Sequence, residues 1–175
     1  AVGVQLATGK RLYAKRIVSN ATRWNTFGAL VDPAEVPESE KRWSNRYKKS
    51  PSFLSIHLGV NRRVITKKDE DCHHIVLENW ENMEDANNAT GTLFLSIPTL
   101  LDPSLAPPGK HIFHIFTPSF IDEWKDLPSS EYERKKNELA DRLIERLERA
   151  AFPGLRQNIE LKIVGTSRTH RRFLG

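Results

Sequence analysis

The sequence predicts an α+β fold in which helices cover a mixed or largely antiparallel sheet. Two observations carry this prediction: a set of β-rich segments joined by polar or proline-containing connectors of about 12 residues, and one long amphipathic helix. The helix is expected at 130–151. The predicted strands are 52–60, 73–79, 91–98, 110–118 and 159–166.

The helix prediction rests on apolar residues that recur at helical spacing and on signals at both ends. Ser130 with Glu133 matches a capping box, and Pro153-Gly154 ends the helix. The outer face alternates Arg and Glu, which is typical of pairing between residues four apart. The apolar stripe consists of Tyr132, Leu139, Leu143, Ile144, Leu147 and Ala151.

The first 50 residues have a different pattern. Residues 2–20 alternate around Thr8-Gly9 and end in Ile17-Val18, which predicts a hairpin followed by the end of a strand. Because an isolated hairpin is marginal in water, we expect it to complete a sheet formed elsewhere. Two helices are predicted at 22–31 and 38–49, on either side of the proline-containing segment DPAEVP.

Composition limits the classes of protein to which the chain can belong. Its 175 residues are 38% hydrophobic and 28% charged, as in a globular domain. The formal charge of +5 is spread along the chain, which favours a solvated surface over a nucleic-acid groove. The single cysteine, Cys72, excludes an internal disulfide, and no apolar run is long enough to span a bilayer.

Histidines and serines are the most conspicuous polar residues of the predicted strands. They mark the polar face of the sheet, although His111 and His114, three residues apart, are expected to point to opposite faces, one buried and one exposed. Cys72-His73-His74 resembles a metal-binding cluster, but neighbouring strand residues diverge and no second cluster has zinc spacing, so we expect no metal site. The polar-face residues are Ser55, His57, Ser96, His111 and His114.

Two further observations concern ligands. The chain contains no G-x-G-x-x-G, P-loop or G-x-S-x-G element, which disfavours a self-contained nucleotide enzyme or esterase. In SFIDEWKDL, Phe120, Ile121 and Trp124 are expected on one side of a short helix, an arrangement that suits a membrane interface as well as a core edge.

Several segments, taken in order, resemble the carotenoid isomerase (prolycopene isomerase) family of flavoproteins, relatives of the phytoene desaturases. The resemblance covers essentially the whole chain. The segments are GVQLATGKRLYAKRIVSNATRWNTF, SPSFLSIHLGV, CHHIVLENW, GTLFLSIPTLLDPSLAPPGKHIFHIFTP, FPGL and VGTSRTHRRFLG.

The resemblance implies an internal fragment of a two-domain, FAD-dependent oxidoreductase-like protein. Residues 1–21 would end a portion of the FAD-binding domain, 22–166 would form the substrate-binding domain, and 167–175 would begin the return to the FAD-binding domain. The Gly-rich loop that holds FAD in such proteins is absent from this sequence. We therefore expect FAD in the full-length protein and an inactive isolated fragment.

The resemblance also suggests site residues. It places Ser19, Asn20 and Ala21 near the cofactor, and Thr169, His170 and Arg171 near the flavin and the substrate tunnel. Ser167 stands where such sequences commonly have proline. No catalytic acid or base is assigned, because reduced FAD carries the chemistry in this family.

The function implied is the cis-to-trans isomerisation of prolycopene to all-trans lycopene in carotenoid biosynthesis. Two alternatives stay open: a desaturase or saturase of the same superfamily, and a non-enzymatic basic binding module. The carotenoid substrate implies a peripheral membrane surface in a plastid or a cyanobacterium, although no targeting segment is visible. No nucleic acid is expected as a partner.

Overall fold

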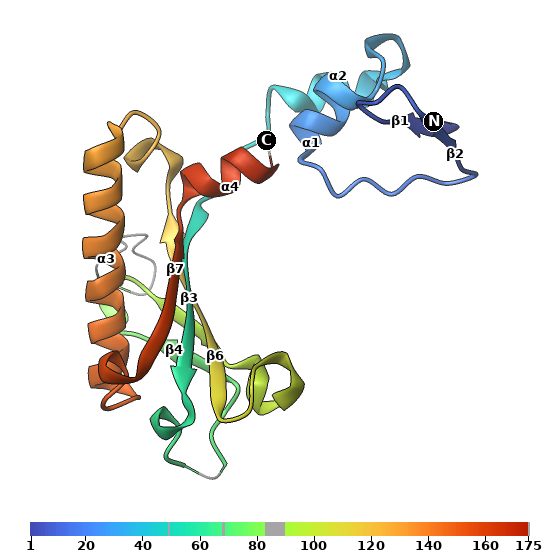
Figure 1. Cartoon of the computed structure of the whole chain (residues 1–175). Helices are drawn as coiled ribbons and strands as arrows, with labels where there is room; N and C mark the ends of the chain where they lie inside the picture. Colours follow the sequence, from blue (N-terminus) through green and yellow to red (C-terminus); the bar gives the residue numbers. More distant parts are fainter. Residues whose placement is uncertain (49, 68, 83–89, 175) are drawn as a thin grey trace. The chain divides into compact units, whose positions relative to one another are not determined.

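The computed structural model describes residues 1–48, 50–67, 69–82 and 90–174. The chain forms two compact units (Figure 1). We call Pro51–His170 the sheet unit, and Ala1–Ser50 together with Arg171–Gly175 the N-terminal unit.

A five-stranded sheet organises the sheet unit, in the order β4-β5-β6-β3-β7. Every neighbouring pair is antiparallel, and β3 and β6 pair along ten residues each. The predicted fold class and all five predicted strand segments are therefore confirmed. The strands are β3 (Ser52–Asn61), β4 (His73–Val76), β5 (Leu93–Ser96), β6 (Lys110–Ser119) and β7 (Ile159–Gly165).

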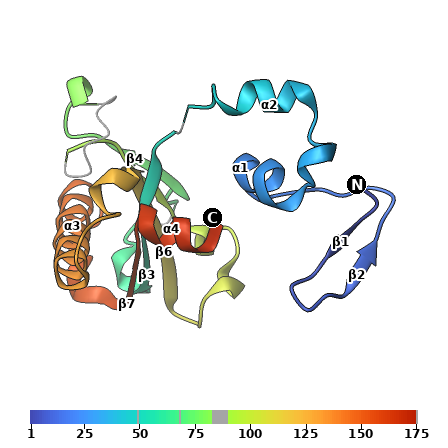
Figure 2. The same ribbon diagram turned by 90° about the horizontal axis from the view of Figure 1, so that it is seen from above.

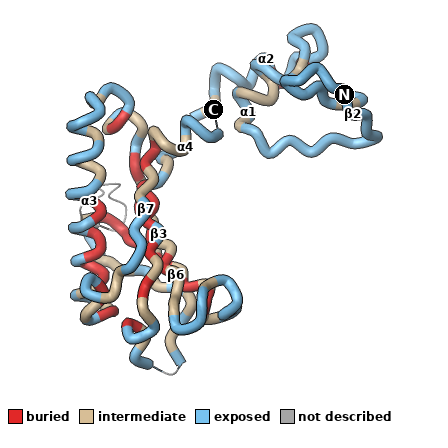
Figure 3. Tube along the Cα trace, in the orientation of Figure 1, coloured by how far each residue is buried: buried red, intermediate tan, exposed pale blue. Residues whose placement is uncertain are grey.

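Helix α3 (Ser129–Ala150) covers one face of this sheet (Figure 2). Alternate residues of β3, including Leu54, Ile56 and Leu58, point to the helix and are fully buried. Leu143 and Leu147 of α3 fill the space against them. The buried residues accordingly concentrate between the sheet and α3 (Figure 3). Among the described residues of the sheet unit, no long helix covers the other face of the sheet.

The predicted capping box of α3 is wrong. The helix begins at Ser129 with Pro128 as its N-cap, and that cap makes no side-chain hydrogen bond. Ser130 thus already lies inside the first turn and cannot cap it, while Glu133 pairs with Lys136 at 2.6 Å. Past the C-terminal end, Gly154 adopts a φ of 80°, a conformation that favours glycine and turns the chain back towards β7.

In 119–127 the core-edge alternative is confirmed for Trp124, which is fully buried. Its indole N–H donates a hydrogen bond to Ser119 Oγ at 2.8 Å, and its ring packs edge-on against Tyr132, with centroids 5.9 Å apart. The segment forms only a 3-10 turn at Ile121–Glu123, so the helical spacing that grouped the three residues does not apply. Phe120 is the exposed member of the set.

Short 3-10 turns join the strands. Prolines open two of them, as expected where an N–H is not needed. The turns other than Ile121–Glu123 in this unit are Arg62–Val64, Trp80–Asn82, Pro98–Leu100, Pro103–Leu105 and Arg156–Asn158.

The N-terminal unit begins with an antiparallel hairpin of β1 (Gly3–Gln5) and β2 (Arg11–Tyr13), which form a two-stranded sheet. The hairpin prediction is confirmed, but the expected strand end at Ile17-Val18 is wrong. These residues have no regular structure and Val18 is 95% exposed. The larger sheet that the hairpin was expected to complete is not found among the described residues, so Ile17-Val18 have no strand to pair with.

Helical turns make up the rest of this unit. The first predicted helix is present as α1 (Arg23–Asn25) continued by a π-helical turn, Thr26–Leu30. A 3-10 turn, Pro33–Glu35, leads to α2 (Glu38–Ser44), which ends five residues before the predicted boundary. The loop following α2 contains the basic residues Arg46 and Lys48.

Helix α4 (Ser167–Leu174) follows β7 directly, and the boundary between the two units falls between His170 and Arg171 within it. Among the described residues, no helix is both long and apolar enough to cross a membrane. The predicted assignment of 1–21 and 167–175 to a cofactor domain and of 22–166 to a substrate domain stays a prediction.

Candidate functional site: the open face of the sheet

The face of the sheet opposite α3 presents two rows of side chains that run across all five strands. Cross-strand pairing defines these rows, because residues directly opposite each other share a face. One row is His73, Ser96, His114, His57 and Ile163. The next is Ile75, Phe94, Phe116, Ser55 and Gly165. We call this surface the open face.

Aromatic rings join these rows into one continuous surface. Phe94 stacks on Phe116 at 5.1 Å with an interplanar angle of 13°, and Phe53 meets Phe116 edge-on at 5.3 Å. His114 in turn lies 5.5 Å from the Phe116 ring. Such ring pairs stabilise one another beyond the area they bury and give the surface a fixed shape.

Aliphatic side chains extend the open face to both edges of the sheet. Ile75 of β4 is 66% exposed, and Leu161 and Ile163 of β7 are 56% and 55% exposed. Gly59 lies opposite Leu161 and leaves room for it, since a Cβ at Gly59 would lie 3.2 Å from Leu161 Cβ. A sheet face this apolar and uncovered is a typical binding surface for an extended apolar ligand.

Imidazole rings supply most of the polar groups on this surface. The rings of His57 and His114 stack with centroids 4.4 Å apart and an interplanar angle of 9°. His170, from α4, lies with its two ring nitrogens 3.2 Å from Ser52 Oγ and 3.4 Å from Ser55 Oγ. The open face thus combines three imidazoles, from β3, β6 and α4, with the aromatic and aliphatic side chains around them.

Burial makes two of these imidazoles weaker bases. It lowers the pKa of His114 and of His170, and electrostatic repulsion from the nearby His57 lowers both further. At neutral pH His114 and His170 are therefore uncharged, and each ring can both donate and accept a hydrogen bond. An uncharged surface of this kind is compatible with an apolar ligand.

The first turn of α4 is anchored firmly next to the open face. Ser167 Oγ donates to Ser119 O at 2.9 Å, Arg168 donates to Leu127 O at 3.0 Å, and the guanidinium of Arg168 lies 4.9 Å from the Tyr132 ring centre. The hydroxyl of Tyr132 lies 3.3 Å from that of Thr169. Since Ser167 uses its side chain here, serine at this position stabilises the turn.

The structure separates the residues that the resemblance proposed for substrate. His170 belongs to the open face, Thr169 turns instead to Tyr132 and to the N–H of Thr166 at 3.1 Å, and Arg171 is exposed in the N-terminal unit. The proposed cofactor residues Ser19, Asn20 and Ala21 form an exposed stretch in which Ser19 Oγ lies 2.8 Å from Thr26 Oγ1. Their roles stay predictions.

Other histidines fall outside the open face. His111 was expected both to mark the polar face and to point away from His114; the latter expectation is confirmed, because the two differ by an odd number along β6. His111 Nδ1 lies 2.9 Å from Thr99 Oγ1, and burial lowers the pKa of His111. Contrary to expectation, His111 and His114 are both half-buried.

The side chains of Cys72, His73 and His74, at the start of β4, point in different directions, as expected for neighbouring residues of a strand. Cys72 Sγ lies 3.4 Å from Ile97 O, His73 is exposed, and the ring of His74 packs against Phe152. Within the described ranges, no three His, Cys, Asp or Glu side chains lie close enough to bind one metal ion.

Sequence reasoning missed the three phenylalanines of the open face. Phe53, Phe94 and Phe116 alternate with the buried residues of their strands, and that alternation was the signal that could have revealed them. The alternation predicts the face of the sheet on which each phenylalanine lies. The cross-strand register that brings the three rings together depends on long-range strand pairing.

Comparison with known proteins finds relatives that match the whole chain. The chain is 55% identical over 175 residues to the chloroplastic prolycopene isomerase of Arabidopsis thaliana, and 54% identical to prolycopene isomerase 2 of an Oncidium hybrid. In both cases the match covers 99% of this chain and 29% of the relative. This chain is a relative of the prolycopene isomerases. The resemblance to the carotenoid isomerase family is thereby confirmed.

Similarity to carotenoid desaturases is weaker. A phytoene dehydrogenase of Streptomyces griseus is 33% identical over 63% of this chain, and a lycopene-forming phytoene desaturase of Pantoea ananas is 27% identical over 97% of it. No protein-family model matches the chain. The chain spans about 29% of the length of the isomerases it matches, so it corresponds to a segment of such a protein.

Proposed function

We propose that this chain is a segment of a carotenoid cis–trans isomerase that converts prolycopene to all-trans lycopene in carotenoid biosynthesis. The observation that carries the proposal is the identity of 54–55% along 99% of the chain to proteins named prolycopene isomerase. The phytoene desaturases reach 26–33%. The isomerase is therefore favoured over a desaturase or saturase.

In this proposal the open face forms one wall of the polyene site. A carotenoid is a long, flat and wholly apolar chain when it carries no oxygen, so it gains most from an extended apolar surface. The stacked Phe94 and Phe116 offer flat rings to the conjugated system, and Ile75 and Ile163 extend the apolar surface to the sheet edges. The neutral rings of His114 and His170 keep fixed charge away from the polyene.

FAD fits the family but not this chain alone. The sequence has no glycine-rich phosphate loop, and the described residues form no β-α-β unit with a helix N-terminus for a pyrophosphate. Residues 19–21 offer exposed backbone without such a cradle. In this proposal other parts of a full-length protein would hold the flavin, and its reduced form would supply the chemistry of isomerisation.

The proposal includes association with a plastid membrane. The isomerases of Arabidopsis and Oncidium are named chloroplastic. An apolar polyene partitions into the bilayer, so an enzyme acting on it gains access by docking at the membrane surface.

The hydrogen count of the product tests the reaction. A full-length protein containing this chain, supplied with reduced FAD and prolycopene in liposomes, should yield a product of unchanged mass with a shifted absorption spectrum. No electron acceptor should be consumed in proportion to product. A product lighter by two hydrogens would instead identify a desaturase, and one heavier by two hydrogens a saturase.

A further inference from the structure

Charge is distributed unequally between the two units. The N-terminal unit contains 12 Lys and Arg residues against four Asp and Glu residues, a formal charge of +8. The sheet unit contains 15 against 18, a formal charge of −3. The overall charge of +5 therefore hides a strongly basic unit next to a weakly acidic one.

Within the basic unit, one short stretch combines cations with an exposed indole. Residues 41–46, in the last turns of α2 and the loop after it, are all exposed, and so is Lys48. Trp43 is 55% exposed, and the Arg46 guanidinium lies 5.9 Å from the centre of its ring. We call this stretch, residues 41–48, the basic anchor; its cations are Lys41, Arg42, Arg46 and Lys48.

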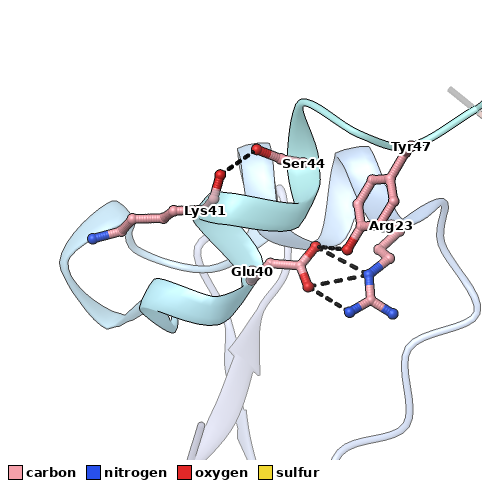
Figure 4. Close-up of polar contacts among 5 residues, drawn as sticks. All are labelled: Arg23, Glu40, Lys41, Ser44 and Tyr47. Atoms are coloured by element: carbon pink, nitrogen blue, oxygen red, sulfur yellow. Dashed lines mark hydrogen bonds and ion pairs between the residues drawn. The ribbon is translucent and has the colours of Figure 1, made fainter.

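An ion pair between the exposed Arg23 and the buried Glu40 fixes the start of the basic anchor to the unit (Figure 4). Glu40, only 5% exposed, accepts hydrogen bonds from Arg23 Nε at 3.0 Å and from the Tyr47 hydroxyl at 2.6 Å. The Arg23 hydrogen bond lowers the pKa of Glu40, so the carboxylate stays charged. Its negative charge is thus turned inward, whereas Lys41 points away from it (Figure 4).

Aromatic contacts complete this support. The guanidinium of Arg23 lies 5.2 Å from the Tyr47 ring centre and 5.5 Å from that of Phe27, and Trp24 meets Tyr47 edge-on at 5.7 Å. Glu40, just before the basic anchor, and Tyr47, near its end, are therefore both held by contacts with Arg23. The Trp43 indole and the cations Arg42, Arg46 and Lys48 are exposed, while Lys41 pairs with Glu38 at 2.7 Å.

We propose that the basic anchor docks this protein on an anionic lipid surface, with the cations among the headgroups and the Trp43 indole at the boundary with the acyl chains. Cations near an anionic leaflet and an amphipathic indole are the two groups that this interface favours. An exposed indole distinguishes the stretch from a phosphate-binding patch made of cations alone. The biological role of this docking rests on the proposed function, because prolycopene is dissolved in a membrane.

Co-sedimentation of the 175-residue chain with vesicles tests this directly. The vesicles contain phosphatidylcholine with about a third phosphatidylglycerol, or phosphatidylcholine alone. The chain should bind the anionic vesicles and release in high salt, since screening weakens exposed charges. The variant Arg42→Gln/Arg46→Gln/Lys48→Gln should bind at least tenfold more weakly, since each cation near the surface is worth about a factor of five.

A matched control removes three exposed cations from the sheet unit instead: Arg62→Gln, Arg63→Gln and Arg134→Gln. Its net charge equals that of the anchor variant. If the position of the cations rather than the total charge decides binding, its affinity for anionic vesicles should stay within about threefold of that of the parent chain. Circular dichroism of each variant verifies that it is folded. Equal losses in the two triple variants would overturn the proposal, as would equal binding to both vesicle types.

Tryptophan emission tests the indole separately. Anionic vesicles should shift the emission of the parent chain and of Trp80→Ser to shorter wavelength, whereas Trp43→Ser should lose most of the shift. Tighter binding to duplex DNA than to the anionic vesicles would assign the basic anchor to nucleic acid and overturn the proposal. These assays contain neither flavin nor polyene, so their failure leaves the proposed reaction standing, and a failed isomerase assay leaves lipid binding standing.

Discussion

The rings of His57 and His114, on neighbouring strands, lie nearly parallel, with centroids 4.4 Å apart and an interplanar angle of 9°. The two residues are a direct cross-strand pair of β3 and β6. Burial, and repulsion from His57, lower the pKa of His114, so the His114 ring is uncharged at neutral pH and adds no positive charge to the stack. The open face thus contains a stacked ring pair of which His114 is uncharged.

Acid should therefore destabilise the sheet unit through His114. Its pKa is lowered in the folded state, so the unfolded state binds the proton more readily; stability is complete above the ordinary histidine pKa of about 6.5 and declines as pH falls through and below it. The groups around it are His57, Ser96, His73 and, at the end of the sheet, His170. His114→Gln should flatten the decline in the free energy of unfolding between pH 7 and pH 5.

Chemical denaturation across that pH range measures the effect. Ser96→Ala serves as the control, because it alters the neighbour of His114 on β5 without removing a titratable group. The explanation fails if His114→Gln keeps the full pH dependence of the parent chain.

Gly165 should tolerate no side chain. A Cβ there would lie 2.8 Å from Ser55 Oγ and 3.6 Å from His170 Nε2, so Gly165→Ala must displace the contact between β3 and α4. We expect a loss of about 1–3 kcal/mol in the free energy of unfolding, the usual cost of overpacking. Gly28→Ala, where no atom lies within 4 Å of the added Cβ, should be neutral or slightly stabilising. Equal effects of the two substitutions would argue against the close approach at Gly165.

Trp124 should behave as a core residue. Trp124→Ala removes a fully buried ring and its hydrogen bond to Ser119, which should cost about 3–5 kcal/mol in the free energy of unfolding. Phe120→Ala, at a residue 42% exposed, should change it by no more than about 0.5 kcal/mol. Urea titrations of the two variants should differ widely in midpoint; similar midpoints would contradict the packing described for 119–127.

The isolated chain should not bind FAD appreciably. The phosphate-cradling glycines are missing, and residues 19–21 provide no substitute for them. Quenching of flavin fluorescence on titration with the chain measures this. Binding at micromolar affinity or tighter would show that the chain contains more of the cofactor site than we infer.

Local pattern was enough to predict the strands and the long helix. The alternation of Leu54, Ile56 and Leu58 and the helical stripe through Leu143 and Leu147 express burial on one side, and burial on one side is what periodicity records. The capping box of α3 failed because Ser130-x-x-Glu133 also fits the interior of a first turn. Pro128 sets the start of the helix, and the spacing of Ser130 and Glu133 alone does not show which residue is the N-cap.

The candidate site was harder to predict because it depends on register. His57 and His114 are 57 positions apart in the chain and meet only through the pairing of β3 with β6, and His170 reaches Ser55 only because α4 follows β7 without a loop. The grouping of Phe120, Ile121 and Trp124 assumed helical spacing, but the segment forms a 3-10 turn. In such a turn residues three apart lie on the same side, so Phe120, four residues before Trp124, does not share its side.

The central claim is that the open face forms part of the polyene site, and the most direct measurement is the rate at which a full-length protein containing this chain converts prolycopene. Phe94→Ser with Phe116→Ser should lower that rate at subsaturating substrate by at least about tenfold, because ~1.4 kcal/mol of lost apolar contact already accounts for that factor. Phe120→Ser, at an exposed phenylalanine outside the open face, should leave it unchanged. A folded double variant that converts prolycopene as fast as the Phe120→Ser control would contradict the account.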